Sequence, residues 1–477
     1  MVKSRWNAKK ELFLHMTGSL HEECGVFGIY GADRDEISSL MYYGLFALQH
    51  RGQESCGIAV NDDAKITCRK NMGLVGEVFD HETLESLKGT MAIGHVRYST
   101  TGASTAVNAQ PLVTHYVKGT LSIAHNGNLT NCDILRKELE DNGAIFSTTT
   151  DSEVICYLIA GIRSNTATVQ EAVAGAMQKI KGGYALLVMS PAKMIAARDP
   201  YGLKPLCMGK LGDAIVFASE SCALAATGAE FIRDVEPGEI VICGRHGIES
   251  IFPLERVKPR RCIFEYIYFA RPDSRIDGVS VFESRIKAGE VLANKCPVEA
   301  DIVTGVPESG IDAALGFSQA SGIPYVKAFV KNSYVGRTFI KPTQQSRRSS
   351  VKIKLNPISE AVKGKRVVMC DDSIVRGTTI ANIVKMLRDA GATEVHVRIS
   401  SPPFMNPCFY GTDVPSRDNL IACHHSIEEI TEIIGADSLV YLSAEELSDI
   451  VSDPERSFCD ACFTGDYPVT EGVEEQI

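Results

Sequence analysis

The chain has 477 residues, enough for two or three domains and a large buried core. Hydrophobic residues make up 44% and charged residues 23%, which excludes a disordered or collagen-like chain. With 49 basic and 59 acidic side chains the net charge is -10, so the chain as a whole repels nucleic acid and anionic lipid, and any phosphate that it binds needs a local basic cluster. No segment approaches the roughly 18 apolar residues of a membrane span, and the first residues lack a secretory cleavage site. We therefore expect a cytoplasmic protein with no nucleic acid and no membrane as partner.

The first half of the chain is predicted to form short strands. Runs rich in β-branched, aromatic and small residues are separated by glycines, as in GVFGIYG from Gly25 and SCGIAV from Ser55. Two helices are predicted between such runs, over 133–142, with Asn131 or Asp133 as the N-cap, and over 152–163, with Asp151 as the N-cap. This pattern indicates a layered α+β domain.

The second half alternates strand, loop and helix. DIVTGV, PESG and IDAALGFSQASG form one such unit from Asp301, and RVVMC, DDSIVRG and TTIANIVKMLRDAG form another from Arg366. In the second helix the apolar residues follow a 3.6-residue period, and Gly391 supplies the stop. These βαβ units predict a mainly parallel sheet, whose ligands bind at the carboxyl ends of the strands, here the PESG and DDSIVRGTT loops.

In the string VVMCDDSIVRGTT, two carboxylates, Asp371 and Asp372, follow a predicted strand, and a helix is predicted to begin after them. A helix N-terminus offers free N–H groups, and the loop adds hydroxyls, as a phosphate monoester requires. Adjacent acids on a strand end point in opposite directions, so we expect them to bind sugar hydroxyls and a metal diphosphate rather than to form one metal pair. The alternative is that Asp372 or Ser373 is only a helix cap.

This string resembles the type I phosphoribosyltransferases. The resemblance implies that GVPES is the diphosphate loop, that KNSYVGRTFIKP is the catalytic loop, and that Ser309, Asp371 and Asp372 lie at a Mg²⁺ ion. The phosphoribosyl diphosphate would be bound by Lys331, Arg337, Asp371, Asp372, Ser373, Arg376, Gly377, Thr378 and Thr379.

A basic segment precedes that string. Residues 327–366 hold eleven Lys or Arg side chains and one acid, Glu360, in a chain of net negative charge. A nucleic-acid site is the competing interpretation, but the segment has no interleaved aromatic residues and no recognition motif. We expect a basic loop that closes over a diphosphate and excludes water.

Cys24 lies directly before a predicted strand and after two glutamates. A thiol is mostly protonated at neutral pH, whereas an α-amino group with a pKa of about 7.7 to 8.0 is a usable base. If the chain were cut after Glu23, Cys24 would supply both nucleophile and base. On spacing alone, an internal core cysteine would be the simpler interpretation.

Five strings favour the nucleophile: CGVFGIYG, HRGQESCGIAV, GHVRYSTTG, AHNGNLTN and TDSEV. They resemble the class II glutamine amidotransferases. The resemblance implies a four-layer αββα fold with an N-terminal nucleophile, Cys24. It also implies Asn126 and Gly127 as oxyanion donors, and a glutamine pocket of Arg97, Thr100 and Asp151.

The order of the two halves resembles the amidophosphoribosyltransferase family from Cys24 to about Tyr467. We expect a leader over 1–23, a glutaminase domain over 24–255, and a phosphoribosyltransferase domain with a C-terminal tail over 256–477. The resemblance implies a pentosyltransferase that uses glutamine and phosphoribosyl diphosphate in the first committed step of purine synthesis, with Mg²⁺, as a homotetramer inhibited by purine nucleotides. A non-catalytic regulator that senses the diphosphate sugar is the alternative, but it would not need a glutaminase half.

The 15 cysteines are too sparse and irregular for a disulfide framework, which indicates reduced thiols. The pair Cys459 and Cys462 forms a CxxC, which by itself fits zinc, a redox dithiol or an iron–sulfur cluster. The resemblance to the Bacillus-type enzymes implies a structural [4Fe–4S] cluster on Cys262, Cys408, Cys459 and Cys462. Spacing alone would not prefer Cys262 and Cys408 to Cys243 or Cys423. The leader could start at Met1 or Met16, and cleavage after Glu23 would remove Trp6, the only tryptophan.

Overall fold

The computed structural model describes residues 23–98, 103–332, 355–412, 414 and 416–474. The described residues divide into two compact units. The larger unit comprises Glu22–Arg285, Cys408–Asp413 and Leu447–Ile477, and the smaller comprises Ile286–Pro407 and Val414–Glu446. No helix in the described ranges is long and apolar enough to cross a membrane.

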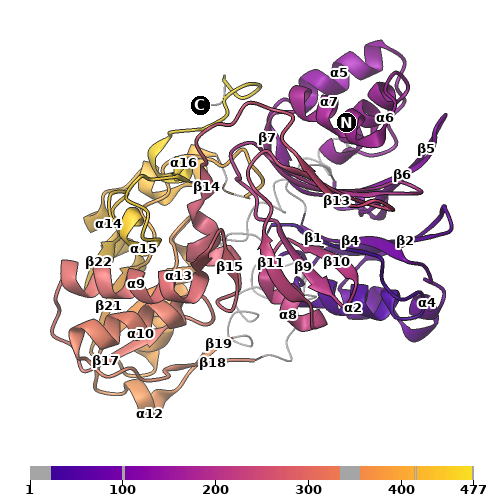
Figure 1. The fold of residues 1–477 in the computed structure, drawn as a ribbon. Coiled ribbons are helices and arrows are strands. Elements are labelled where there is room, and N and C mark those ends of the chain that lie inside the picture. The colour runs from indigo at the N-terminus through magenta and orange to yellow at the C-terminus, as the bar shows by residue number, and fades with distance from the viewer. Residues whose placement is uncertain (1–22, 99–102, 333–354, 413, 415, 475–477) are drawn as a thin grey trace, which may run out of the picture. The chain divides into compact units, whose positions relative to one another are not determined.

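Two antiparallel sheets form the centre of the larger unit (Figure 1). The seven-stranded sheet has the order β11 (Glu230–Asp234), β9 (Cys207–Leu211), β10 (Ala214–Ala218), β1 (Gly25–Tyr30), β4 (Met91–Arg97), β2 (Ser55–Asp62), β3 (Lys65–Met72). The six-stranded sheet has the order β13 (Gly247–Ile251), β12 (Ile240–Gly244), β8 (Met194–Arg198), β7 (Gly182–Met189), β6 (Gly119–Leu129), β5 (Leu112–Tyr116).

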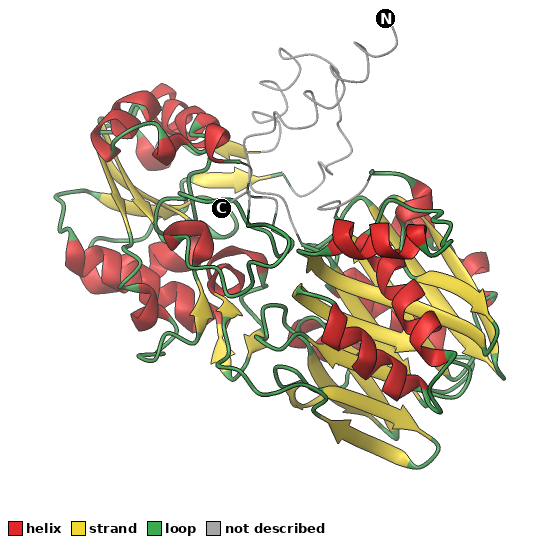
Figure 2. Cartoon of the chain, turned by 90° about the horizontal axis from the view of Figure 1, so that it is seen from above, coloured by secondary structure: helices red, strands yellow, loops and turns green. Residues whose placement is uncertain are grey.

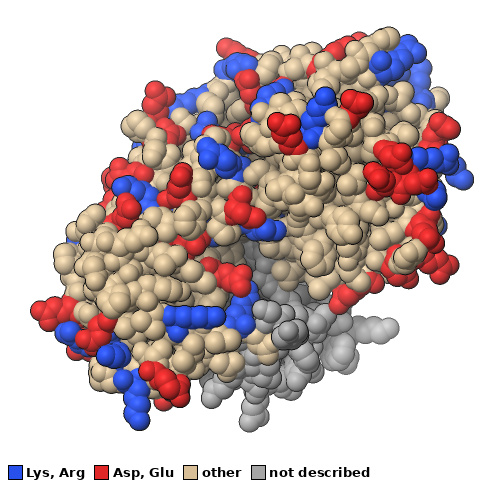
Figure 3. All heavy atoms as spheres, turned by 60° about the horizontal axis from the view of Figure 1, so that its bottom comes forward, with Lys and Arg blue, Asp and Glu red and all other residues tan. Residues whose placement is uncertain are grey.

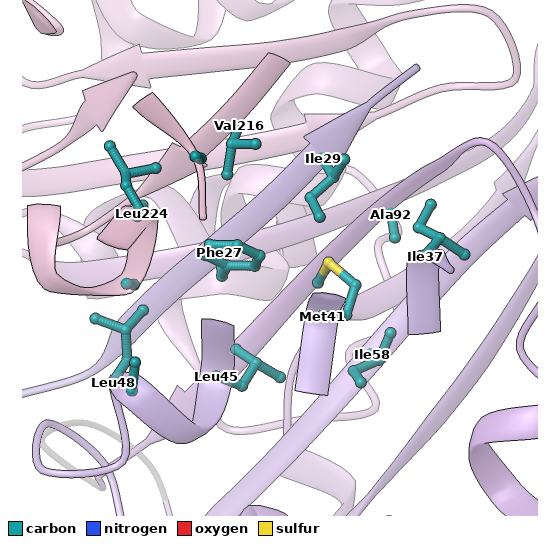
Figure 4. Packing of buried hydrophobic residues seen from close by; sticks show 14 of the residues in the cluster. Phe27, Ile29, Ile37, Met41, Leu45, Leu48, Ile58, Ala92, Val216 and Leu224 are labelled. Atoms are coloured by element: carbon teal, nitrogen blue, oxygen red, sulfur yellow. The ribbon is translucent and has the colours of Figure 1, made fainter. Parts of the chain in front are cut away.

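Both faces of β1 are buried, which explains why its sequence is almost wholly apolar. Val26 packs in the core between the two sheets, whereas Phe27 and Ile29 point the other way, into the cluster formed with helix α2 (Ile37–Ala47; Figure 4). A Cβ at Gly44 of α2 would lie 2.4 Å from the Phe27 ring, so this glycine lets the helix approach the sheet closely.

Helices cover the outer face of each sheet. On one side lie α2, α3 (Val75–Val78), α4 (His81–Glu85) and α8 (Ser221–Thr227), and on the other lie α5 (Cys132–Asp141), α6 (Asp151–Arg163) and α7 (Val169–Lys179). The order helix, sheet, sheet, helix is the expected four-layer arrangement. The two helices predicted for 133–142 and 152–163 are α5 and α6, but the Asp151 cap is wrong: Thr150 is the N-cap and Asp151 begins the helix.

The smaller unit is built on a parallel sheet of order β17 (Ile302–Gly305), β20 (Arg366–Asp371), β21 (Glu394–Ile399), β22 (Ser438–Tyr441). Val367 and Met369 point into the core formed with α13 (Thr378–Asp389) and α14 (Ile427–Ile434). On the opposite face α10 (Gly310–Ser321) packs closely against the sheet. The close approach requires a glycine, since a Cβ at Gly310 would lie 2.4 Å from the Cys370 carbonyl oxygen. Figure 2 shows helices on both sides of this sheet. The predicted βαβ pattern is confirmed.

Short elements complete the two units. The smaller unit holds the hairpin β18 (Phe329–Lys331) and β19 (Leu355–Pro357), α12 (Ser359–Val362) and residues 286–295 of α9 (Val281–Lys295). The larger unit holds β14 (Arg261–Cys262), β15 (Arg275–Ile276), β16 (Val279–Ser280), α15 (Leu447–Ile450), β23 (Phe458–Cys459), α16 (Ala461–Thr464) and a π-helical turn at Glu265–Phe269.

The compact units do not coincide with the predicted domains of 24–255 and 256–477. β14 pairs in parallel with β23, so residues 256–285 and the tail from Leu447 lie together in the larger unit. The two paired strands are nearly 200 residues apart in the sequence. A local sequence pattern cannot predict such a pairing, because it contains no information about distant segments.

Candidate functional site

Cys24 lies one residue before β1, at the N-terminal end of the central strand of the seven-stranded sheet. Its side chain is 7% exposed, and its Sγ donates to the Tyr98 carbonyl oxygen at 3.4 Å. Burial raises the pKa of the thiol to about 11, against the opposing effect of the Arg97 guanidinium. In the uncut chain Cys24 has an amide nitrogen and a protonated thiol, so it lacks its own base.

Arg97 and Asp151 are electrostatic neighbours of Cys24, as the predicted glutamine pocket requires. Arg97 ends β4, which pairs with β1, so the ladder brings it alongside the start of β1. Asp151 begins α6, and the Leu129 N–H donates to its Oδ2 at 3.0 Å. Burial alone would raise the pKa of Asp151, but His125 and backbone hydrogen bonds hold it below its usual value. The site therefore contains a buried guanidinium and a buried ionised carboxylate. Thr100 lies outside the described residues.

Asn126 and Gly127 lie on β6, in the second sheet. Asn126 Nδ2 donates to Ser219 Oγ at 3.5 Å, and the same hydroxyl accepts from the Val26 N–H at 2.9 Å, so Ser219 links β1 to the asparagine. Asn126 Oδ1 is buried and has no hydrogen-bond partner among the described residues. Gly127 has φ +140°, and a Cβ there would lie 2.0 Å from the Gly183 carbonyl oxygen. Only glycine fits this conformation.

Further buried polar groups around Cys24 were not predicted from the sequence. His125 Nδ1 lies 3.6 Å from Asp151 Oδ1, and Asn126 Nδ2 donates to Ser219 Oγ. Arg51 is fully buried, and its Nε donates to the Cys24 carbonyl oxygen at 3.0 Å. His125 and Arg51 lie in two of the five strings, AHNGNLTN and HRGQESCGIAV, but a string does not say which member faces the nucleophile. Ser219 lies in none of the five strings.

In the smaller unit, the two predicted acids lie at the carboxyl end of β20, each 8% exposed. Asp372 Oδ2 accepts from Ser309 Oγ at 2.5 Å, and the Ser373 hydroxyl donates to its other oxygen. Burial and the Asp372 charge raise the pKa of Asp371 well above its usual value. The structure thus brings together the three predicted Mg²⁺ residues, Ser309, Asp371 and Asp372.

The loop after these acids leads into α13 through Gly377, which has φ +76° and is the N-cap. Thr378 and Thr379 form the exposed first turn, and Arg376 is half-buried. Lys331, at the end of β18, lies with its Nζ 3.4 Å from Glu308 Oε1 in the neighbouring PESG loop.

The basic segment is only partly described. Arg337 and five further basic residues lie outside the described residues: Lys341, Arg347, Arg348, Lys352 and Lys354. On the face shown in Figure 3, basic and acidic side chains are interspersed over the part of the chain that is described.

The four predicted cluster cysteines are neighbours in the larger unit. Cys262 and Cys459 are register partners in β14 and β23, and Cys462 is an electrostatic neighbour of Cys262, Cys408 and Cys459. Burial raises the pKa of Cys459 to about 12. Of the competing thiols, Cys243 lies in the core between the sheets and Cys423 donates to the Met405 carbonyl oxygen in the smaller unit. Within the described ranges no three His, Cys, Asp or Glu side chains form a group placed to hold a metal ion.

Known proteins resemble this chain over most of its length. Residues 95–226 match the glutamine amidotransferase domain family, which assigns the class of the larger unit. Over nearly its whole length the chain is similar to amidophosphoribosyltransferases. It is 50% identical to that of Bacillus subtilis over 463 residues (96% of each chain) and 50% identical to that of Archaeoglobus fulgidus over 454 residues (95% and 99%).

A solved structure has the same fold: the glutamine phosphoribosylpyrophosphate amidotransferase of B. subtilis complexed with ADP and GMP, with a TM-score of 0.89 at 48% identity, covering 95% of this chain and 99% of that one. The chain belongs to the amidophosphoribosyltransferase family. The predicted family and fold class are confirmed.

Proposed function

We propose that this chain converts glutamine, phosphoribosyl diphosphate and water into phosphoribosylamine, glutamate and diphosphate, the first committed step of purine synthesis. The observation that carries the proposal is the presence in one chain of a buried Cys24–Arg97–Asp151 site and a Ser309–Asp371–Asp372 loop at the end of a parallel sheet. A glutaminase alone needs only the first of these sites, and a sensor of the sugar diphosphate needs only the second.

At the first site, the Cys24 sulfur attacks the amide carbon of glutamine. Arg97 would pair with the substrate carboxylate and Asp151 with its ammonium group, which holds the amide near the thiol. The oxyanion that develops would be stabilised by Asn126 Nδ2 and the Gly127 N–H, donors of the kind worth roughly 3 kcal/mol each. Collapse of this intermediate releases ammonia and leaves a thioester, which water hydrolyses to glutamate. Thr100 belongs to the same proposed pocket.

The base in this mechanism is the α-amino group that appears when the chain is cut between Glu23 and Cys24. A thiol whose pKa is near 11 needs such a base at neutral pH. We therefore propose that residues 1–23 are a leader that is removed, whether translation begins at Met1 or Met16. Because Trp6 is the only tryptophan, the mature chain should have none.

At the second site, the residues that the sequence motifs indicate would bind phosphoribosyl diphosphate. The first turn of α13, from Thr378, offers N–H groups and hydroxyls to the 5-phosphate, and the Asp371–Asp372 pair faces the sugar hydroxyls. The oxygen donors of Ser309, Asp371 and Asp372 suit Mg²⁺, which would neutralise the diphosphate as it leaves. Lys331, Arg337, Ser373, Arg376, Gly377 and Thr379 complete the proposed site.

The four neighbouring cysteines fit a [4Fe–4S] cluster by the chemistry of their donors. In such a cluster each thiolate binds a different iron, so the sulfurs need not converge on one ion. The side chains of Cys262 and Cys459 lie on paired strands that join the crossover to the tail, which supports a structural role. Iron and acid-labile sulfide should both be lost in Cys459→Ser and retained in the control Cys243→Ser, after anaerobic purification. Bound zinc, or no metal in the unaltered chain, would contradict the cluster.

We also propose an oligomeric state and a form of regulation for this chain. The B. subtilis relative was solved with ADP and GMP, which supports inhibition of this chain by purine nucleotides. We propose a cytoplasmic homotetramer, to be checked by light scattering of the purified protein.

The first experiment separates the two sites. Glutamate release from glutamine should depend on phosphoribosyl diphosphate and fall at least about 1000-fold in Cys24→Ala, while ammonia-dependent diphosphate release persists. Asp371→Ala should abolish both. Cys68→Ala, which changes a half-buried thiol on β3 of the same unit, is the control. Loss of ammonia-dependent activity in a folded Cys24→Ala protein would show that the two-site proposal is wrong.

A further inference from the structure

Glu23, the residue directly before the nucleophile, has a buried side chain that is 1% exposed. Lys204 Nζ lies 2.8 Å from its Oε2, the Thr412 hydroxyl donates to its Oε1 at 2.7 Å, and Arg51 Nη2 lies at 3.3 Å. Burial by itself would raise the pKa of Glu23, but Lys204 and Arg51 hold it below its usual value. A solvent-facing leader residue would need none of these partners, so the carboxylate is specifically bound.

The same groups hold the chain on the other side of the Glu23–Cys24 bond. Arg51 Nε donates to the Cys24 carbonyl oxygen at 3.0 Å, while its remaining nitrogens bind Glu220 and Glu265, each at 2.6 Å. Arg51 is therefore fixed by two carboxylates of the larger unit. The peptide bond between Glu23 and Cys24 is thus held from both sides by buried groups.

Three buried carboxylates share this cluster. Glu23, Glu220 and Glu265 lie around Arg51 and Lys204, and the partly exposed His50 lies with its Nε2 2.8 Å from Glu220 Oε1. Burial raises the pKa of Glu265 to about 7, with Arg51 opposing and the Glu23 charge adding to the rise. Removal of Glu23 relieves this repulsion between carboxylates, which favours release of the cut leader.

We propose that Lys204, Thr412 and Arg51 form a carboxylate-recognition subsite that makes self-cleavage before Cys24 selective for glutamate at position 23. The inference rests on the proposed removal of the leader. Cys24 Sγ adds to the Glu23 carbonyl carbon, the C–N bond breaks, and the thiol proton passes to the leaving nitrogen, which gives a thioester and the free α-amine of Cys24. Water then hydrolyses the thioester to the Glu23 carboxyl group and the Cys24 thiol. Lys204 and Thr412 are positioning residues in this step, because they hold the residue that is cut off.

Position 23 offers a clean test, because every Glu23 variant yields the same mature chain once it is cut. The rate is followed on the full chain by intact mass and by loss of Trp6 from the purified protein. Glu23→Gln should slow cleavage about tenfold to a hundredfold, the effect of losing charge-assisted hydrogen bonds in a buried site. Cleavage of Glu23→Gln at the unaltered rate would overturn the subsite.

A double-mutant cycle identifies the partner. Lys204→Met should also slow cleavage, and Glu23→Gln combined with Lys204→Met should be no slower than the slower single variant, because both remove one contact. Merely structural damage by Lys204→Met would instead multiply with the effect of Glu23→Gln and contradict the assignment. Lys88→Met, which removes an exposed pair with Asp35, is the matched control and should cleave normally.

Two further results keep the inference separate from the proposals on which it rests. If Lys204→Met does not fold, Glu23→Gln decides by itself, because its mature product is unaltered. If the unaltered chain retains residues 1–23 while releasing glutamate from glutamine, then cleavage, the subsite and the α-amino base of Cys24 are wrong, whereas the glutaminase activity stands.

Discussion

The two proposed sites are built in opposite ways. Around Cys24, opposite charges and fixed hydrogen bonds are already in place: Arg97 ends a strand paired with β1, and Asp151 is held by His125 and the Leu129 N–H. At the end of β20, by contrast, two buried carboxylates lie side by side, and burial and mutual repulsion dominate the pKa of Asp371. The charged groups of the first proposed site already pair with one another, whereas the second proposed site would be completed by a cation and a charged substrate. The following variants test this difference.

The largest effect is expected at Gly127, where the first proposed site depends on backbone geometry. Gly127→Ala places a Cβ 2.0 Å from the Gly183 carbonyl oxygen at φ +140°, so the paired strands β6 and β7 must separate. We expect a loss of about 3 kcal/mol, which lowers the melting temperature by roughly 6 to 12 °C. Gly161→Ala, on α6 with no neighbouring atom within 4 Å, should be neutral or slightly stabilising. Equal melting temperatures for the two variants, in thermal unfolding, would remove the argument for a rigid site.

A smaller effect is expected at Arg97, which tests whether the first site recognises a carboxylate by the geometry of the guanidinium as well as by its charge. Arg97→Lys keeps the charge but loses the planar fork that pairs with a carboxylate, so kcat/KM for glutamine should fall about tenfold to a hundredfold. Ammonia-dependent activity should be unaltered, since ammonia bypasses this pocket. Arg69→Lys, on the exposed strand β3, is the control in the same steady-state assay. An equal loss with ammonia would show that Arg97 supports the fold rather than glutamine.

The smallest effect concerns stability at the second site. The pKa of Asp371 is higher in the folded chain than the ordinary value of 3.8, so the folded chain binds this proton more tightly than the unfolded chain does. The protonated group therefore stabilises the folded chain at low pH. This stabilisation should be lost as the pH rises from about 3.8 through the raised pKa. Asp371→Asn should therefore stabilise the free protein by about 1 kcal/mol at neutral pH. Mg²⁺ should raise the melting temperature of the unaltered chain more than that of the variant. Asp389→Asn, at an exposed position on α13, should leave both the pH profile and the Mg²⁺ response unaltered.

Much of the fold could be predicted from local patterns. The short runs separated by glycines predicted the strands of the first half, the βαβ order predicted the parallel sheet of the second half, and the 3.6-residue period placed α13. The Asp151 cap failed because Thr150 and Asp151 are both good N-cap residues, and the choice between them depends on where the chain enters the helix. Helices α2, α7 and α8 were not predicted.

The candidate sites likewise combine features that could be predicted from the sequence with features that could not. The sequence by itself determined which residue types could do the chemistry: a cysteine before a strand, two acids before a helix, and a CxxC in the tail. Only the tertiary structure decided that Cys262 and Cys408, rather than Cys243 and Cys423, lie beside that CxxC, and that Arg51 and Lys204 bind Glu23. The physical reason is that a local pattern depends on backbone period and side-chain type, whereas a buried thiol or charge is placed by strand pairing between distant segments.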